Sequence, residues 1–527
     1  MISKKFTNVI VSFIAVVFLS ALSGCAGKHI GIQENRPLHK SLKSSDALYK
    51  YALEDVAAQA PKSGFYPLEH HLDSLAARLA LAKFAKKRIT VQYFTFYDDD
   101  VGAILMKALI DAADRGVQVD ILFDDIELSE TDDLAAMVNA HSNITLRVFN
   151  PTNSRGNAHY AEMGLNAHTV GRRMHNKSFT ADNSMAVYGG RNIGDMYFGL
   201  NEEKFFVDND MLAVGPLVNK ITNEFDIYFS NAYSVDFEYI AKATKKDLDT
   251  ALKEKIEVLK RDEGAEALRS AIKNREITKQ FLSQTIPLYF GDAVLLYDMP
   301  EKITTDVEDT STHIEGKIPQ DIRATKRFYM VSPYFIPTEK MLARIQKMLD
   351  KGIDVAVLTN SLESSDSAAV YAFYSKSQKK LLKMGVRLYE IHPNAFADAV
   401  LKQDYNTLKE MPTAVLHAKT IVIDDDFFVI GSVNMDPRSR QLNTELVSII
   451  KNSELNTHEA ELFKKLTAPK NAYQLSLEYK DDNSSKIVWE AVINGEQKKF
   501  YDDGNAGTWL HMKKNMSLWF SSLEDLL

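Results

Sequence analysis

The sequence predicts an α/β protein of two pseudo-symmetric lobes, each with a mixed or mainly parallel sheet flanked by helices. Two observations support this. Strand-like and helix-like segments follow one another in the same order twice, and one His-x-Lys-x4-Asp pattern occurs in each copy. Alternation of strands and helices favours a sheet covered on both faces. Two matched copies in one chain are expected to pack about a pseudo-twofold axis and to share one site where they meet.

The elements of the first copy are clear from hydrophobic periodicity. Apolar residues recur at helical spacing over 68–82 and again over 101–113. Gly116 ends the second of these helices, because glycine readily adopts the left-handed conformation of a helix cap. Strands of the buried type are predicted at 89–94, 117–123 and 144–149.

The second copy repeats this order. Strands are predicted at 328–331, 353–358 and 386–390, and helices lie between them, around 342–349 and 368–384. Residues 241–283 form a charged helical stretch between the copies, and residues 394–413 form a loop of the length often seen in lids. The predicted boundaries are 64–285 for the N-terminal lobe, 286–472 for the C-terminal lobe and 473–527 for an extension that contains all three tryptophans.

The N-terminus has the pattern of an export signal. Lys4 and Lys5 precede an apolar run over 9–22, which is too short for an ordinary membrane span. Residues 1–24 are therefore predicted to be a signal peptide and 25–63 a tether. Cys25 is the only cysteine, so no disulfide and no cysteine metal site can form within the chain.

Residues 22–25, Leu-Ser-Gly-Cys, resemble the bacterial lipobox. The resemblance implies that Cys25 is acylated, and acyl chains would anchor the protein to a membrane facing the periplasm. Ala26 favours the outer membrane, with the inner membrane as the alternative. A plain signal peptide with an incidental cysteine is the other interpretation.

Charge argues against one class of partner. The chain of 527 residues carries a formal net charge of −8. Phosphate backbones attract proteins through dense lysine and arginine, so nucleic acid is not an expected partner. A local basic pocket remains compatible with this charge.

The strongest functional signal is the repeated motif. His175, Lys177 and Asp182 form one copy, and His417, Lys419 and Asp424 form the other. The downstream spacing matches as well, because the asparagine of a glycine-containing turn follows the histidine by the same interval in both copies, at Asn192 and Asn434. One such match would be weak, but two at matching places in a repeat predict a paired site.

The spacing explains a possible chemistry. Residues two apart on a strand point the same way, so each histidine shares a face with its lysine. Two lysines can bind phosphate oxygens and stabilise a charged transition state. One imidazole can attack phosphorus to form a covalent phosphohistidine, and the other can protonate the leaving oxygen. No metal or other cofactor is required by this scheme.

Neighbouring residues receive supporting roles. Each histidine needs a carboxylate on its other nitrogen. We predict that Glu445 supplies one of these carboxylates and that Asp210, which aligns with Glu445 in the repeat, supplies the other. Asp208 is the alternative to Asp210. Asn192, Asn434 and Ser432 are expected to bind phosphate or hold their loops. Asp182 and Asp424 are expected to point away from the histidines and to stabilise the lobe interface.

These residues resemble the phospholipase D superfamily, and several segments are similar to bacterial cardiolipin synthases of the C type. The resemblance implies two phospholipase D-like lobes with the active site between them. It implies transfer of a phosphatidyl group to phosphatidylglycerol, with phosphatidylethanolamine as a possible donor, and His175 as nucleophile with His417 as acid and base. An accessory protein is left open. The similar segments are 64–69, 122–125, 173–177, 189–195 and 436–439.

Other functions share parts of this pattern. A phospholipase D hydrolase would use the same motifs with water as acceptor. A periplasmic nuclease of the superfamily usually has one motif per chain and dimerises. A lipoprotein scaffold with an inactive site is disfavoured by two intact His-Lys pairs. At the tail, Trp509, Met512 and Met516 recur at helical spacing with Trp519 or Phe520 and Leu523; this face is predicted to lie either in a lipid interface or against the lobes.

Overall fold

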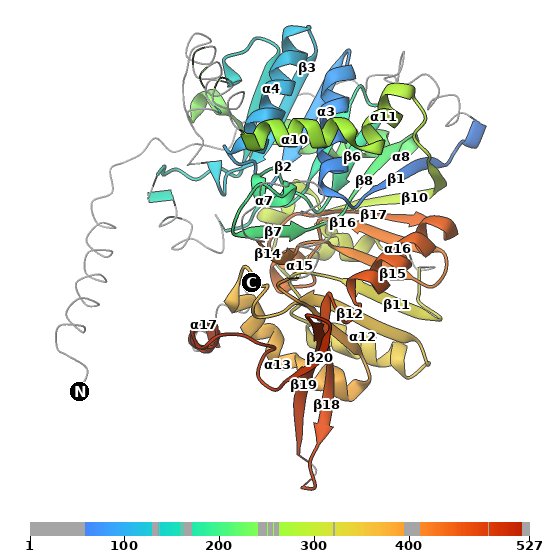
Figure 1. The fold of residues 1–527 in the computed structure, drawn as a ribbon. Helices are drawn as coiled ribbons and strands as arrows, with labels where there is room; N and C mark the ends of the chain where they lie inside the picture. The colour runs from blue at the N-terminus through green and yellow to red at the C-terminus, as the bar shows by residue number, and fades with distance from the viewer. Residues whose placement is uncertain are drawn as a thin grey trace, which may run out of the picture.

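The computed structural model has two stacked lobes, the N-terminal one in blue to green and the C-terminal one in yellow to red (Figure 1). It describes residues 58–518 with internal gaps. The predicted signal peptide, Cys25 and almost all of the predicted tether lie outside the described residues, as does most of the loop predicted at 394–413. The gaps are 129–134, 136–137, 157, 160–161, 163–170, 241–249, 251–253, 255–256, 258–262, 320–321, 395–411 and 483.

Within the described residues, one continuous sheet of 18 strands runs through both lobes. At its centre β1 (Ser63–Leu68) pairs antiparallel with β10 (Tyr289–Tyr297). On its other edge β1 pairs with β8 (Asp210–Val214), and β10 pairs with β17 (Leu446–Lys451). The sequence suggested one sheet per lobe; the β1–β10 pairing joins them, because these two strands lie on the pseudo-twofold axis.

Outward from the centre the two halves repeat the same strand order. The N-terminal half continues through β6 (Met185–Gly189), β5 (Ser178–Ala181), β2 (Arg88–Tyr93), β3 (Gln118–Asp124), β4 (Ile144–Phe149) and β9 (Ser234–Asp236). The C-terminal half continues through β16 (Phe427–Gly431), β15 (Thr420–Ile423), β11 (Arg327–Val331), β12 (Asp354–Asn360), β13 (Arg387–Ile391) and β18 (Ala472–Tyr479). The parallel pairs are β2–β3–β4 and β11–β12–β13, so the sheet is mixed.

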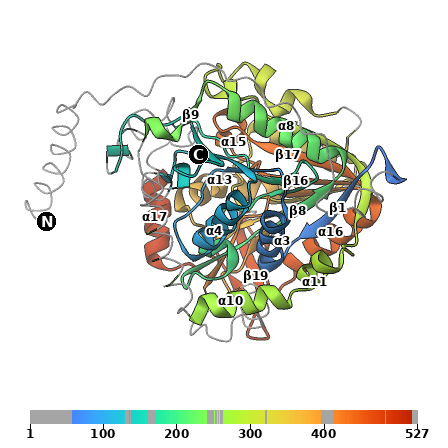
Figure 2. The same ribbon diagram turned by 90° about the horizontal axis from the view of Figure 1, so that it is seen from above.

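Helices cover both faces of the sheet. In the N-terminal lobe α3 (His71–Phe84) and α8 (Pro216–Ser230) lie on opposite sides of β8 (Figure 2). The other long helices of this lobe are α4 (Asp100–Asp114), α10 (Glu263–Asn274) and α11 (Glu276–Ser283). The C-terminal lobe has α12 (Glu339–Leu349), α13 (Ala368–Met384) and α16 (Ser453–Leu466). The α/β prediction with two related lobes is confirmed.

The extension prolongs the C-terminal half of the sheet. The predicted boundary between residues 472 and 473 falls inside β18, which pairs with β13 and then with β19 (Ser485–Ile493), and β20 (Glu496–Phe500) follows. The last described helix, α17 (Thr508–Leu518), packs on α13. Trp509, Met512 and Met516 are exposed on it, whereas Trp519, Phe520 and Leu523 lie outside the described residues. None of the helices described is long and apolar enough to cross a bilayer.

Candidate active site

Each motif opens a short antiparallel hairpin. His175 and Lys177 immediately precede β5, which pairs with β6, and His417 and Lys419 precede β15, which pairs with β16. Short extended segments from the other lobe fix both histidines. The His175 backbone N–H donates to Thr444 O at 2.8 Å, and the His417 N–H donates to Val207 O at 2.8 Å. The second contact extends a small parallel sheet of β7 (Lys204–Val207) and β14 (Thr413–Leu416) that joins the two lobes.

Each histidine is paired with a carboxylate of the opposite lobe. His175 Nδ1 lies 2.9 Å from Glu445 Oε2, and His417 Nδ1 lies 2.6 Å from Asp208 Oδ2. All four side chains are buried. A carboxylate on Nδ1 fixes the tautomer and orientation of an imidazole and leaves Nε2 available for chemistry.

The prediction that Asp210 orients a histidine is wrong. In the sheet Asp210 is opposite Gly189, whereas Val447 is opposite Gly431. The strand register therefore aligns Asp210 with Val447, and Asp208, the alternative, with Glu445. The two-residue offset was hidden in the sequence because the chain between motif and carboxylate is longer in the first copy.

Asp210 instead belongs to a buried ion cluster. Its Oδ2 accepts from Ser74 Oγ at 2.6 Å and from Arg78 Nη2 at 2.9 Å. The backbone N–H of Arg191 donates to its Oδ1 at 3.2 Å. These contacts tie α3 to β8, so Asp210 supports the lobe rather than a histidine.

The motif aspartates cap strands within their own lobes, so the expectation that they stabilise the lobe interface is wrong. Asp182 accepts from the backbone N–H groups of residues 86, 87 and 88 at 2.8–3.0 Å, where β2 begins. Asp424 accepts from those of residues 325, 326 and 327, where β11 begins. Both have positive φ values, 52° and 51°, which the tight hairpin turn requires.

The two lysines lie beside the histidines with little access to solvent. Lys177 Nζ donates to the carbonyl O of His175 at 2.7 Å, and Lys419 Nζ lies 3.1 Å from His417 Nδ1. Burial lowers the pKa of Lys177 to about 7 and that of Lys419 to about 8. Each ammonium also lowers the pKa of the other lobe's histidine, which places both motifs within one electrostatic site.

Both imidazoles are neutral in this environment. Burial, with the nearby lysines, lowers the pKa of His175 to about 4 and that of His417 to about 3. For Asp208 burial acts in the opposite direction, but His417, Lys419 and Arg191 lower its pKa to about 2. A phosphodiester anion in the site would raise the pKa values of the histidines and lysines, because an opposite charge favours the protonated form.

The predicted phosphate or loop residues have different surroundings. Ser432 Oγ donates to Glu445, and Ser439 Oγ donates to the same carboxylate at 2.7 Å, so both hold the partner of His175. Asn192 accepts from the Thr95 N–H and donates to Tyr197 OH at 2.8 Å, which holds its loop. Asn434 Oδ1 is buried and has no hydrogen-bond partner in the structure.

Aromatic rings from outside the two motifs surround the histidines. The Phe94 ring lies 4.9 Å from that of His175 and beneath the Lys177 ammonium. Tyr197 and Phe206 each lie 5.2 Å from the His417 ring. The sequence carries no signal for these positions apart from their aromatic character, because they come from separate loops and strands.

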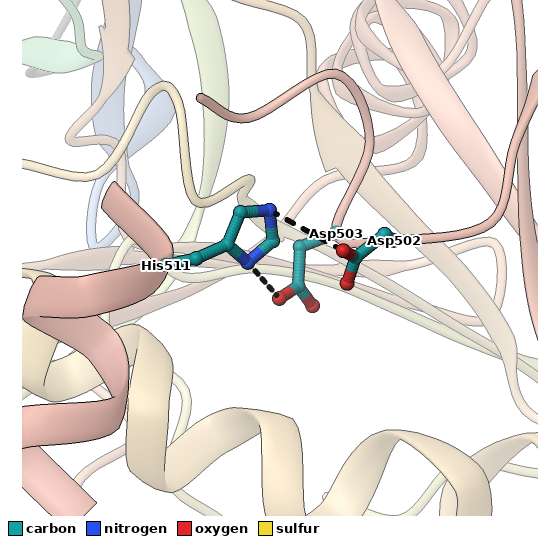
Figure 3. Close-up of side chains that lie close together, drawn as sticks. All are labelled: Asp502, Asp503 and His511. Carbon is teal, nitrogen blue, oxygen red and sulfur yellow. Dashed lines mark ion pairs between the residues drawn. The ribbon is translucent and has the colours of Figure 1, made fainter. Parts of the chain in front are cut away.

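In the described part of the chain, one group of carboxylates and histidine is compact enough to hold a metal ion, and it lies in the extension. Ligand atoms of Asp502, Asp503 and His511 lie within 4.8 Å of one another (Figure 3). The Lys514 ammonium already donates a hydrogen bond to Asp503. Asp503 also accepts one, at 3.1 Å, from the hydroxyl of Tyr371 on α13. These contacts fasten α17 to the C-terminal lobe, and we assign no metal to them.

Comparison with known proteins agrees with this geometry. The profile of a family described as "Cardiolipin synthase, PLD-like domain" matches residues 79–229 and 320–467, one match in each lobe. The chain belongs to this cardiolipin synthase family of phospholipase D-like enzymes. The predicted family and enzyme class, a phospholipase D-type phosphatidyltransferase, are confirmed at this level.

Relatives in this family match over most of their length. Cardiolipin synthase C of Escherichia coli strain K12 is 34% identical over 415 residues, which are 77% of this chain and 85% of the relative. An uncharacterized protein of Helicobacter pylori strain 26695 is 31% identical over 503 residues, 92% of this chain and 94% of the relative. The crystal structure of phosphatidylserine synthase from Haemophilus influenzae Rd KW20 covers 91% of this chain and 99% of its own, with a TM-score of 0.55 at 12% identity; it supports the fold of the family.

Proposed function

We propose that this enzyme transfers a phosphatidyl group from one phospholipid to phosphatidylglycerol through a phosphohistidine, and so makes cardiolipin. The observation that carries the proposal is the pair of cross-lobe dyads, His175–Glu445 and His417–Asp208, with two buried lysines between the lobes. The substrate class is taken from the relatives, among them a cardiolipin synthase.

In the first step Nε2 of His175 attacks phosphorus, and the bond from phosphorus to the headgroup oxygen breaks. The bound phosphodiester anion favours the protonated form of His417, and His417 gives its Nε2 proton to the leaving oxygen. In the second step His417 takes the proton of the acceptor hydroxyl, whose oxygen attacks phosphorus, and the P–N bond breaks. Each transfer by a positioned acid or base contributes typically ~10²–10⁴-fold. The ammonium groups of Lys177 and Lys419 stabilise the phosphoryl oxygens throughout.

The choice of His175 as nucleophile follows the superfamily resemblance, in which the first motif provides it. The neutral state of both imidazoles is compatible with either assignment. Trapping the intermediate decides the question: with donor lipid labelled at phosphorus, acid-labile label on His175 supports this assignment, and label on His417 reverses it.

The function is tested with purified full-length chain and labelled phosphatidylglycerol, with and without phosphatidylethanolamine. Cardiolipin as product supports the proposal. Phosphatidic acid as sole product would show a hydrolase that uses water as acceptor, and DNA cleavage without lipid turnover would show a nuclease. His175→Ala and His417→Ala are each expected to abolish turnover. His458→Ala, on the outer helix α16, is the matched control and is expected to keep it.

We also propose that the enzyme is a bacterial lipoprotein facing the periplasm, anchored through Cys25 and held in the outer membrane, with the inner membrane as alternative. The lipobox-like residues 22–25 carry this proposal. Metabolic labelling with a palmitate analogue should mark the wild-type chain and not Cys25→Ser. Labelling of Cys25→Ser would contradict it, and membrane fractionation distinguishes the two membranes.

A further inference from the structure

A cavity of about 530 Å³ lies in the C-terminal lobe, between α12 and one face of the sheet. Its walls are mainly apolar, and they are contributed by β11, β15 and β16, by α12 and by the segment that follows β10. Cavities of this size and character are typical of sites for small apolar ligands or parts of them.

The N-terminal lobe shows that this space is a specific feature of the second copy. The two copies can be compared at positions that follow their motif histidines by the same number of residues. In the first copy these residues are fully buried: Phe179, Val187 and Ile193. Their counterparts in the second copy are only partly buried and line the cavity: Ile421, Val429 and Met435. In the first lobe α3 follows β1 and packs on this face. In the second lobe, β10 is followed by the short 3-10 turns η3 (Pro300–Ile303), η4 (Thr310–Thr312) and η5 (Ile314–Lys317), which leave the face open.

The inner end of the cavity is polar and borders the active site. Glu445, the carboxylate that holds His175, forms part of its wall. His313 and Asn434 also line it, and each has a buried polar atom, Nε2 and Oδ1 respectively, without a hydrogen-bond partner in the structure. Such atoms cost free energy unless a ligand or water satisfies them, so this end is suited to polar groups of a bound molecule.

The outer rim of the cavity is basic although the chain as a whole is acidic. Lys347 and Lys351 are exposed at the rim, next to Lys340 and Arg344, whose side chains are each 60% exposed and share Glu315 as partner. A second group of lysines lies on the other side of α12, on the neighbouring helix α13: Lys376, Lys379, Lys380 and Lys383. A membrane surface that contains anionic lipids attracts a cluster of this kind.

We propose that this cavity holds one acyl chain of an anionic phospholipid whose headgroup lies at the polar inner end, and that the basic rim of α12 attracts the anionic membrane surface from which the lipid enters. The apolar walls match the chain, the unpartnered polar atoms of the inner end match the headgroup, and the position beside Glu445 places that headgroup next to the catalytic centre. The proposal rests on the proposed function for the identity of this lipid as a substrate. It gives the two lobes different tasks, because the matching face of the N-terminal lobe is filled by α3.

The test uses phosphatidylglycerol with a photoactivatable group in its acyl chain, presented in neutral detergent micelles to the full-length protein. After irradiation, mass spectrometry is expected to find the label in peptides that contain residues 421–435 or 341–348. Val429→Trp fills the cavity and should reduce labelling by at least about tenfold, roughly the loss from exposing two methylene groups. The matched control is Leu282→Trp on α11, where Leu282 is 64% exposed, and it should label as wild type.

The rim is tested separately with the double variant Lys347→Glu and Lys351→Glu. It should lose the preference for phosphatidylglycerol over a phosphatidylcholine that carries the same labelled chain. Label confined to peptides outside the cavity, or unchanged labelling of Val429→Trp, would overturn the proposal. Lipid transfer without labelling of the cavity would contradict the acyl site and support the proposed function. Labelling of the cavity without any lipid turnover would support the acyl site and contradict the proposed function. Thermal unfolding of Val429→Trp verifies that it is folded.

Discussion

Glu445 of the C-terminal lobe bonds Nδ1 of His175 in the N-terminal lobe, at 2.9 Å, and the reciprocal bond joins Asp208 to His417. Neither lobe therefore contains a complete histidine–carboxylate pair. The site exists only where the lobes meet, and the backbone contacts of both histidines cross the same interface.

Asp208→Asn and Asp210→Asn are expected to have different effects although the two residues are neighbours. Asp208→Asn removes the negative partner of His417 and should lower turnover per folded molecule by ~10²-fold or more. Asp210→Asn weakens the buried ion pair with Arg78, so it should lower the free energy of unfolding by about 3–5 kcal/mol. Steady-state turnover and urea unfolding of both variants test this, and a pure loss of activity in Asp210→Asn would contradict the assignment.

Gly190→Ala should disturb the same pair by steric contact. A Cβ atom at residue 190 would overlap Asp208 Oδ1, so the carboxylate has to move away from His417. Turnover is expected to fall by about tenfold or more. The matched position in the second lobe is Ser432, whose hydroxyl holds Glu445. Ser432→Ala keeps the space but loses the hydrogen bond to Glu445 and the one from the Leu446 N–H, and kinetics should show a smaller loss of turnover than for Gly190→Ala.

Asp182→Ala and Asp424→Ala should destabilise the protein with little change in turnover per folded molecule. Each carboxylate satisfies three backbone N–H groups at the start of a strand, and leaving such donors without a partner costs about 1–3 kcal/mol. Asp182→Ala should cost more, because Asp182 is buried and Asp424 is partly exposed. Chemical unfolding measures both. A loss of turnover in fully folded protein would place these residues in the catalytic site.

Affinity for dimethyl phosphate, a phosphodiester that stays a monoanion over this pH range, should depend on pH through the two lysines. The pKa values of Lys177 and Lys419 are about 7 and about 8, so both side chains are charged at lower pH and lose their protons as the pH rises through this range. Because the ammonium forms bind the anion, affinity should be highest below pH 7 and should fall between about 7 and 9. Calorimetric titration with dimethyl phosphate at several pH values measures this affinity.

Lys177→Arg supplies the control for this pH dependence. Arginine stays protonated, so the part of the fall that belongs to Lys177 should disappear. Lys177→Met should bind dimethyl phosphate weakly at every pH. An affinity that rises with pH, or that is constant in wild type, would contradict the role given to these ammonium groups.

The sequence by itself determined the two-lobed α/β plan and the motif residues, because hydrophobic periodicity and a repeated pattern are local properties. It could not determine which carboxylate serves which histidine. That depends on strand register, which aligns Asp208 rather than Asp210 with Glu445, and on the exchange of partners between lobes. The tertiary structure was also needed to show that matching faces of the two half-sheets differ. In the N-terminal lobe α3 covers this face, and in the C-terminal lobe the face lines a cavity. Contacts between residues far apart in the chain decide both features, and no local pattern encodes them.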